Sequence, residues 1–270
     1  MQYIRNISIP WVSLWLALAA PAAMAQSVHI SHCSQACPQS PDVDEIVVHH
    51  LYAAGIEGQT GMAEWVSYRV IRDSIGVASL LPRLWQSDRL LEVELAPELQ
   101  ETSGDDFFQP DLSNAQDSEY RVNEILYNVE DRGRLAPMTS FAGTPYWREL
   151  NNLSNMAPLP RDLRLGSWAR LEQAINGLAA QVGEVYVLAG PLQQAEQSIS
   201  TPSAYYKVVL FDNRLASFIF RADLDQNDSY CSQVSSLANI EEMTGLHLFP
   251  DLAGLQESEL LTELGCGQSE

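Results

Sequence analysis

Three short stretches decide how this chain is expected to fold: DRGRLAP at 131–137, LSNMAP at 153–158 and RLGSWARLE at 164–172. Within and beyond the third stretch, apolar residues recur every three or four positions from Trp168 to Leu178. This spacing predicts a helix from about Gly166 to Gln181 with one buried face. The first and third stretches each contain an arginine, Arg134 and Arg164, on which the functional interpretation depends.

Strand patterns lie on both sides of this helix. The predicted strands are 46–48 and 65–71 around a glycine-rich turn at 55–61, then 185–189, and then 204–211 and 217–222 around a turn at 212–213. A second helix pattern runs from Val234 to Met243 and is expected to stop at Gly245. Residues 86–120 are acidic and are expected to form a surface loop. Because strands and helices are interleaved without a βαβ rhythm, the predicted fold class is α+β, a mixed α/β core.

The N-terminus has the pattern of a secretory signal. A short basic start precedes an apolar run, and Ala23-Met24-Ala25 supplies small residues for cleavage, so residues 1–25 are expected to be removed. A retained N-terminal anchor is the alternative. The expected organisation is a signal peptide at 1–25, a disulfide-stapled arm at 26–45 and one domain at 46–270 in a secreted or periplasmic protein, with no membrane contact in its mature form.

The four cysteines fit export. They are Cys33, Cys37, Cys231 and Cys266. Four cysteines allow three pairings, and an exported chain makes disulfides the expected state. The close pair Cys33–Cys37 would staple the arm, and Cys231–Cys266 would tie down the last helical region. A zinc site is disfavoured because neither pair has C-x-x-C spacing.

The charge balance restricts the partners. The chain has 15 basic and 35 acidic residues, a formal net charge of −20. This lowers the expectation of strong non-specific binding to DNA, which normally requires a basic footprint. It suits a basic protein partner, and it leaves room for a local basic cleft because distant charges are screened.

The quoted stretches resemble the DNA/RNA non-specific endonucleases, the ββα-metal nucleases of the Serratia extracellular type and the relatives of endonuclease G. Their signature is D-R-G-H followed by x-A-P, then L-S-N-x-x-P-Q and an N-x-G-x-W helix carrying a glutamate. Further segments resemble the family: WVSY at 65–68, PRLW at 82–85, GPL at 190–192 and PSAYYKV at 202–208. The resemblance therefore implies a ββα-metal fold with a central antiparallel sheet, and hydrolysis of nucleic acid with Mg²⁺.

The resemblance also assigns roles position by position. Arg132 and Arg83 match phosphate contacts, Asn151 and Asn155 match polar, phosphate-binding residues around the site, and Glu172 matches the carboxylate that orders metal-bound water. Asp131 fits the signature. The alternatives are purely structural roles, in which Asn155 caps a turn and Glu172 is a helix carboxylate paired with a neighbour.

Two positions depart from the family pattern. Arg134 stands at the position of the histidine base, and Arg164 stands at the position of the metal-binding asparagine. Arginine is effectively always protonated and offers no lone pair to a proton or a metal ion. The expected Mg²⁺ is therefore doubtful here, and catalysis is expected to be lost or strongly reduced.

Several substitutes remain open. Glu130, His49 or His50 could replace the base, Arg164 could replace the cation in a metal-free phosphate clamp, and Arg164 could pair with Glu172. Three functions follow: an impaired nuclease that keeps a cleft for phosphate or nucleic acid, an active endonuclease with an altered base and metal site, or a non-catalytic module that binds a protein.

Overall fold

The computed structural model describes residues 29–40, 43–57, 62–79, 81–82, 85–91, 119–122, 125–128, 132–192, 202–257 and 259–267. The expected signal peptide at 1–25 lies outside these residues. None of the helices in the described ranges has the length and apolar character needed to cross a membrane.

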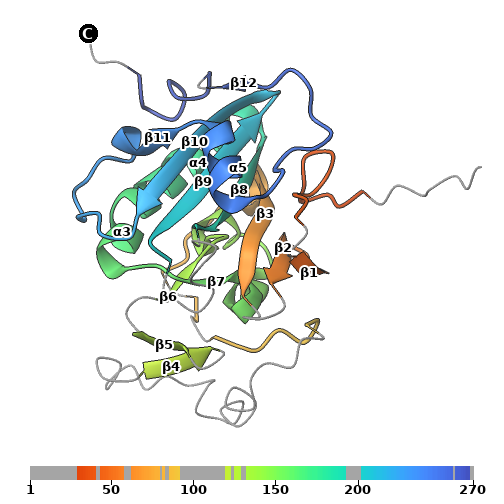
Figure 1. Ribbon diagram of the computed structural model, residues 1–270, viewed down its shortest axis with the longest axis vertical. Coiled ribbons are helices and arrows are strands. Elements are labelled where there is room, and N and C mark those ends of the chain that lie inside the picture. Colours follow the sequence, from red (N-terminus) through yellow and green to blue (C-terminus); the bar gives the residue numbers. More distant parts are fainter. Residues whose placement is uncertain are drawn as a thin grey trace, which may run out of the picture.

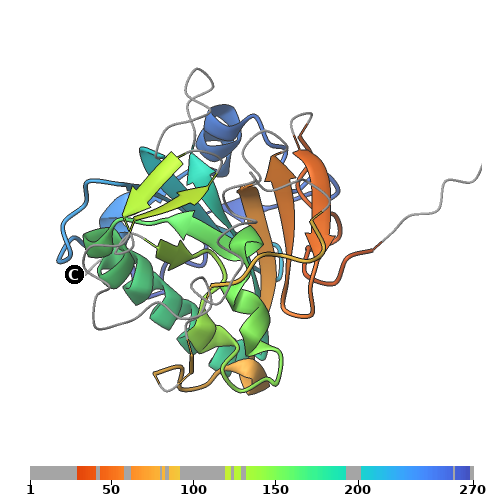
Figure 2. The same cartoon turned by 90° about the horizontal axis from the view of Figure 1, so that it is seen from below.

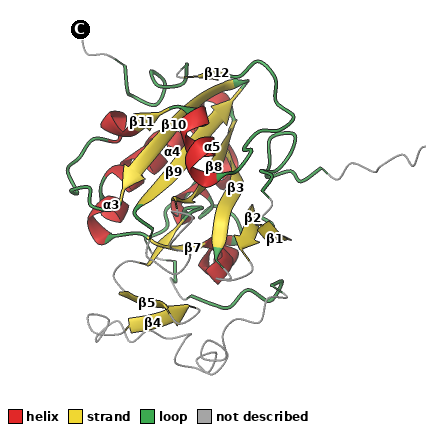
Figure 3. Cartoon of the chain, in the orientation of Figure 1, coloured by secondary structure: helices red, strands yellow, loops and turns green. Residues whose placement is uncertain are grey.

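A central sheet organises the molecule (Figures 1 and 3). Its strands follow the order β1 (Val43–Val48), β2 (Tyr52–Glu57), β3 (Ala63–Ile71), β8 (Glu184–Leu192), β9 (Ala204–Phe211), β10 (Arg214–Arg221) and β11 (Val234–Ser235). All neighbours along this path are antiparallel. Only β12 (Gln256–Glu257), which pairs with β10, runs parallel to its partner within the described sheet. The predicted α+β class with a central antiparallel sheet is confirmed.

Helices cover both faces of this sheet, as Figures 1 and 2 show. The long helix α4 (Ser167–Val182) packs its apolar face on side chains such as Val187 and Val209. The helix α5 (Leu237–Thr244) packs on the opposite face, against the neighbouring residues Leu188 and Val208. Successive side chains of a strand point to opposite faces, so the apolar strands β8 and β9 supply two cores.

Glycines set the limits of α4. The helix follows α3 (Arg161–Leu165) after Gly166, where a Cβ atom would lie 2.5 Å from the carbonyl oxygen of Asp162 and 2.6 Å from that of Gln226. No side chain fits at that distance. The helix ends at Gly183, which has a φ of 103°. The predicted helix at 166–181 is confirmed, and Gly245, with a φ of 71°, ends α5 as expected.

The predicted N-terminal hairpin was incomplete. The chain turns first at His49–Leu51, so β1 and β2 form one hairpin, and β2 and β3 form a second. Gly55 lies inside β2 and not in a turn. A Cβ atom at this position would lie 2.2 Å from the Trp65 indole, so no larger residue fits beside that ring. This glycine makes room for a buried ring.

The second predicted helix also begins later than its apolar pattern. Val234 belongs to β11, and α5 starts after Ser236, whose side chain accepts a hydrogen bond from the Asn239 amide. A serine in this position is a favoured helix cap. The predicted turn at Asp212 and Asn213 is confirmed, with φ values of 49° and 59°.

Both expected disulfides are present, Cys33–Cys37 and Cys231–Cys266. The first closes the arm near the edge of the sheet. The second joins the end of the chain to η6 (Tyr230–Gln233), a single 3₁₀ turn.

Two small sheets and several 3₁₀ turns complete the described fold. One sheet pairs β4 (Glu119–Val122) with β5 (Ile125–Asn128), and the other pairs β6 (Arg132–Arg134) with β7 (Met156–Pro158). The remaining turns are η1 (Arg72–Ser74), η3 (Met138–Ser140), η4 (Trp147–Asn151) and η5 (Leu153–Asn155).

Candidate functional site

The β6–β7 ladder joins two of the sequence stretches that decide the fold. Gly133 lies opposite Ala157, and Arg134 lies opposite Met156. A Cβ atom at Gly133 would lie 2.4 Å from the Leu159 side chain, so only glycine allows the strands to approach this closely. Asp131 lies outside the described residues, and Arg132 is described only through its backbone in β6.

Asn155 holds the connection between these stretches. Its Oδ1 accepts a hydrogen bond from the Ala136 amide at 2.8 Å, and its Nδ2 donates to the carbonyls of Ala136 and Leu150, each at 3.0 Å. The side chain is completely buried. These contacts show that Asn155 positions the loop, and its expected contact with phosphate stays a prediction.

Arg134, Arg164 and Glu172 meet in a cavity of about 180 Å³ between β6, η3 and the start of α4. We call it the two-arginine pocket. Its lining consists of Ala78, Gly133, Arg134, Pro137, Met138, Thr139, Arg164, Leu165, Trp168 and Glu172. The structure thus brings together the three residues for which the resemblance implied a base, a metal ligand and an assisting carboxylate.

Arg134 is held in place by two neighbours. Its Nη2 donates to Asn151 Oδ1 at 2.5 Å, and its guanidinium carbon lies 4.4 Å from the centre of the Trp85 ring. Asn151 is itself buried and donates to the Pro82 carbonyl at 3.3 Å. A cation over an indole face is a favourable arrangement, and here it also limits the motion of a long side chain.

Glu172 forms a buried ion pair beneath the pocket. Its Oε1 lies 2.9 Å from Nζ of Lys207, a β9 residue that has no exposed surface, and the same Nζ lies 3.8 Å from the Trp168 ring. Burial raises the pKa of Glu172 above its ordinary value, while the Lys207 ammonium opposes that rise. The carboxylate thus pairs with Lys207.

The charges of this pocket do not fit Mg²⁺. Magnesium needs oxygen ligands in an octahedral shell, whereas the guanidinium groups of Arg134 and Arg164 offer only donors. Glu172 is the one carboxylate among the described lining residues, and the Lys207 ammonium already balances its charge. Nor do the described ranges contain any group of three or more His, Cys, Asp or Glu side chains arranged to hold a metal ion. The donor set suits an anion.

The other expected residues lie elsewhere. His49 and His50 lie in the β1–β2 turn and line a second cavity, separate from the residues of the two-arginine pocket. Arg83 and Glu130 are outside the described residues.

Two residues near the site were missed from the sequence. Nothing in the sequence around Trp85 indicates its contact with Arg134. Lys207 did give a signal, because it interrupts the apolar run AYYKVVLF of β9. A lysine inside a fully buried strand requires a buried carboxylate, and this rule points to an acidic partner such as Glu172.

Comparisons with known proteins agree with this architecture. The family model for DNA/RNA non-specific endonuclease matches residues 32–254. A nuclease of Serratia marcescens is 29% identical over 267 residues, covering 93% of this chain and 92% of that protein. EndoG, solved in its complex with EndoGI, has a TM-score of 0.55 and 19% identity, covering 79% of this chain and 89% of that chain, a likeness of fold. The chain belongs to the DNA/RNA non-specific endonuclease family.

Proposed function

We propose that this protein is an exported family member that binds the phosphodiester backbone of nucleic acid at the two-arginine pocket and hydrolyses it weakly or not at all. One observation carries the proposal: Arg134 and Arg164 line the same pocket as Glu172, while Lys207 neutralises that carboxylate. The pocket therefore contains more positive than negative charge among its described lining residues.

The binding half of the proposal follows from guanidinium chemistry. A planar guanidinium offers donors in a fixed fork that matches two oxygens of a phosphate. The contacts of Arg134 with Asn151 and Trp85 fix its direction before a ligand arrives, so less side-chain entropy is lost on binding. In this proposal Arg132 and Arg83 add further phosphate contacts.

The catalytic half follows from what the same residues cannot do. Phosphodiester hydrolysis needs a base that accepts a proton from water, and a guanidinium cannot accept one. Loss of general-base catalysis alone costs roughly 10²–10⁴-fold in rate. Loss of a metal ion removes charge stabilisation of the departing oxygen as well. Both losses together leave a clamp that binds phosphate.

The expected export rests on two features. The N-terminal pattern is that of a cleaved signal, and the disulfides Cys33–Cys37 and Cys231–Cys266 are typical of oxidising compartments. In this proposal the mature protein acts in the periplasm or outside the cell.

The test uses the purified mature chain with plasmid DNA and with RNA. Cleavage is followed with Mg²⁺, with Mn²⁺ and with EDTA, and binding of a labelled oligonucleotide is measured over a range of salt concentrations. The proposal expects no metal-dependent cleavage above the blank, together with binding that weakens as salt increases. Arg134→Gln and Arg164→Gln should each weaken binding, whereas Arg221→Gln, an exposed control, should not. Rapid metal-dependent cleavage by the natural protein contradicts it.

A second candidate is a protein-interaction module. The net charge of −20 favours a basic partner, and the related fold of EndoG has been solved bound to EndoGI. A chain that binds no oligonucleotide at low salt but captures a basic protein in a salt-sensitive way would support this candidate.

A further inference from the structure

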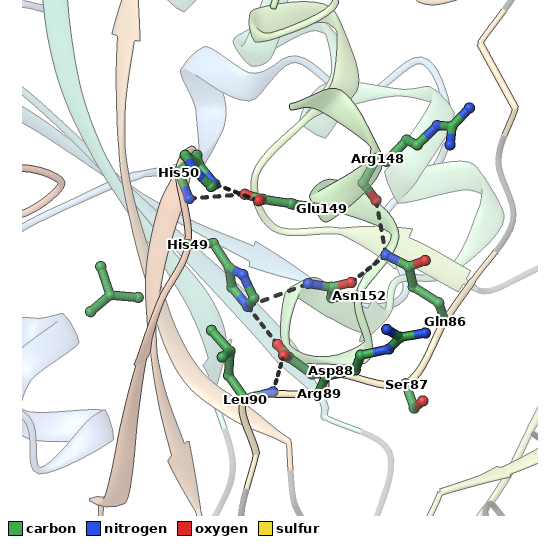
Figure 4. Close-up of a pocket in the computed structure, with 11 residues that line it drawn as sticks. His49, His50, Gln86, Ser87, Asp88, Arg89, Leu90, Arg148, Glu149 and Asn152 are labelled. Atoms are coloured by element: carbon green, nitrogen blue, oxygen red, sulfur yellow. Dashed lines mark hydrogen bonds and ion pairs between the residues drawn. The ribbon is translucent and has the colours of Figure 1, made fainter. Parts of the chain in front are cut away.

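A second cavity in the described part of the chain lies outside the two-arginine pocket. It has a volume of about 930 Å³ and is formed by the β1–β2 turn, the segment 86–90 and η4 (Figure 4). We call it the histidine pocket, because His49 and His50 face it from the turn.

The two carboxylates of the histidine pocket already have hydrogen-bond donors within the protein. Asp88 has no exposed side-chain surface and accepts hydrogen bonds from His49 Nε2 at 2.7 Å, from the Leu90 amide at 3.0 Å and from the Ser154 hydroxyl. Glu149 accepts from the His50 amide at 2.9 Å and from His50 Nδ1 at 2.6 Å. Their charges are therefore matched by donors within the protein and are not directed at a cationic ligand.

Two exposed arginines at the same pocket lack such partners. Neither the Arg89 nor the Arg148 guanidinium makes a hydrogen bond or an ion pair with any residue in the described ranges; Arg148 lies only 5.5 Å from the Trp147 ring. Other described arginines do have partners: Arg69–Glu184, Arg214–Glu263 and Arg221–Asp223 are ion pairs, and Arg72 and Arg170 donate to backbone carbonyls. In a protein with a net charge of −20, two unmatched guanidinium groups at one cavity indicate an anionic ligand.

An exposed aromatic ring, His50, lines the same pocket as these arginines. The His50 ring stacks on Tyr146 with centroids 4.0 Å apart and an interplanar angle of 3°. The His50 side chain is 60% exposed and Tyr146 is 45% exposed. Exposed ring faces beside cationic groups are the features with which proteins hold unpaired nucleotides, since every base has a face to stack.

His49 adds a polar group of fixed orientation. Its Nε2 lies 2.7 Å from the Asp88 carboxylate and 3.3 Å from Asn152 Nδ2, so the shorter, charge-assisted contact determines that Nε2 donates to Asp88. Within the described residues Nδ1 has no hydrogen-bond partner. In the neutral ring, Nδ1 can accept a hydrogen bond from a ligand hydroxyl or amino group.

A thin wall separates the two pockets. Trp85 contacts Arg134 on one side, and the next residue, Gln86, bonds Asn152 at 2.6 Å on the other. Likewise Asn151 accepts from Arg134, while Asn152 adjoins His49. Consecutive residues of these two segments therefore contact residues of different pockets, so the pockets are neighbours in the fold.

We propose that the histidine pocket is a second nucleic-acid subsite, in which the cationic Arg89 and Arg148 attract the phosphates of an unpaired strand and the exposed His50 ring, stacked on Tyr146, packs against a base. The inference rests on the proposed function, since the two-arginine pocket holds a neighbouring phosphate of the same strand.

The test measures the histidine ring resonances of the full mature chain by NMR while adenosine monophosphate is added. The variants His49→Asn and His50→Gln assign the resonances. The nucleotide should shift the His49 and His50 signals and leave those of His29 and His247 unchanged. Arg89→Gln with Arg148→Gln should weaken this binding at least tenfold, and Arg221→Gln should not.

Further measurements distinguish binding of a whole nucleotide from binding of phosphate alone. Tyr146→Ala should weaken binding of adenosine monophosphate but not that of inorganic phosphate. Inorganic phosphate that binds as tightly as the nucleotide overturns the nucleotide assignment, and unchanged affinity in the Arg89→Gln and Arg148→Gln double variant overturns the site. Arg134→Gln should leave the mononucleotide shifts intact. If it also leaves oligonucleotide affinity intact, the proposed function fails while the histidine pocket still binds nucleotide.

Discussion

Lys207 Nζ lies 2.9 Å from Glu172 Oε1, and neither residue can reach bulk water easily: the lysine side chain is fully buried and the glutamate side chain is 13% exposed. This pair connects β9 to α4 directly beneath Arg134 and Arg164. It stabilises the floor of the two-arginine pocket and occupies the one carboxylate among the described lining residues that could otherwise attract a cation there.

Breaking this ion pair should destabilise the protein. Lys207→Met leaves the Glu172 carboxylate buried without its counter-ion, and removal of one partner of a buried pair costs about 3–5 kcal/mol. The double variant Lys207→Met with Glu172→Gln should recover part of that loss, because no isolated charge remains. Urea unfolding of the four proteins of the cycle measures both effects. Equal stability of Lys207→Met and the natural chain would show that the pair does not form.

Removal of the Asn155 amide should damage both stability and binding. Asn155→Ala leaves the Ala136 amide and the carbonyls of Ala136 and Leu150 without their partner, and a buried unsatisfied group costs about 1–3 kcal/mol. The exposed Asn239→Ala variant is the control. Asn155→Ala should lower the unfolding temperature and weaken oligonucleotide binding. Asn239→Ala should change neither. Intact stability with reduced binding would instead favour the direct phosphate contact.

The Asp88 network should give a pH-dependent contribution to stability. Burial opposes ionisation of Asp88, but the hydrogen bonds from His49 and Ser154 outweigh it and hold the pKa of Asp88 below its ordinary value of 3.8. A depressed carboxyl pKa stabilises the fold above the ordinary value, and this contribution is lost as the pH falls through the folded pKa. The stability difference between the natural chain and Asp88→Asn should therefore be largest near neutral pH and should shrink below about pH 4. A difference that grows on acidification contradicts the network.

The two disulfides should contribute unequally. Cys231 and Cys266 are 35 residues apart, whereas Cys33 and Cys37 are only 4 apart. On the loop-entropy model the longer loop contributes roughly 3–4 kcal/mol, and the shorter loop contributes less. The paired serine variants Cys231→Ser with Cys266→Ser and Cys33→Ser with Cys37→Ser compare them directly in denaturant unfolding. A greater loss from the N-terminal pair would mean that the arm, and not the C-terminal segment, limits stability.

Much of the fold could be predicted because its signals are local. The apolar spacing from Trp168 predicts α4, and the turn residues Asp212 and Asn213 predict the β9–β10 hairpin. Gly55 misled the prediction, since its role is set by a ring ten positions away in the sequence. The glycine pattern alone does not distinguish a turn from a close approach inside a strand.

The candidate site could be predicted only in part. Arg134, Arg164 and Glu172 lie in recognisable stretches, so their meeting in one pocket was expected. The Asp88–His49 contact joins residues 39 positions apart, and nothing near Asp88 in the sequence indicates it. Part of the expected acidic loop at 86–120 instead forms a wall of the histidine pocket, because Gln86 bridges to Asn152.

We propose that Arg134 and Arg164 prevent metal-dependent hydrolysis. The most direct measurement is the initial rate of plasmid cleavage, with Mg²⁺ and with EDTA, by the natural chain and by the double variant Arg134→His with Arg164→Asn. We expect no EDTA-sensitive cleavage by the natural chain and its appearance in the double variant, because a histidine base and a neutral oxygen ligand are then present beside Glu172. EDTA-sensitive cleavage by the natural chain at a rate equal to or above that of the double variant would contradict it.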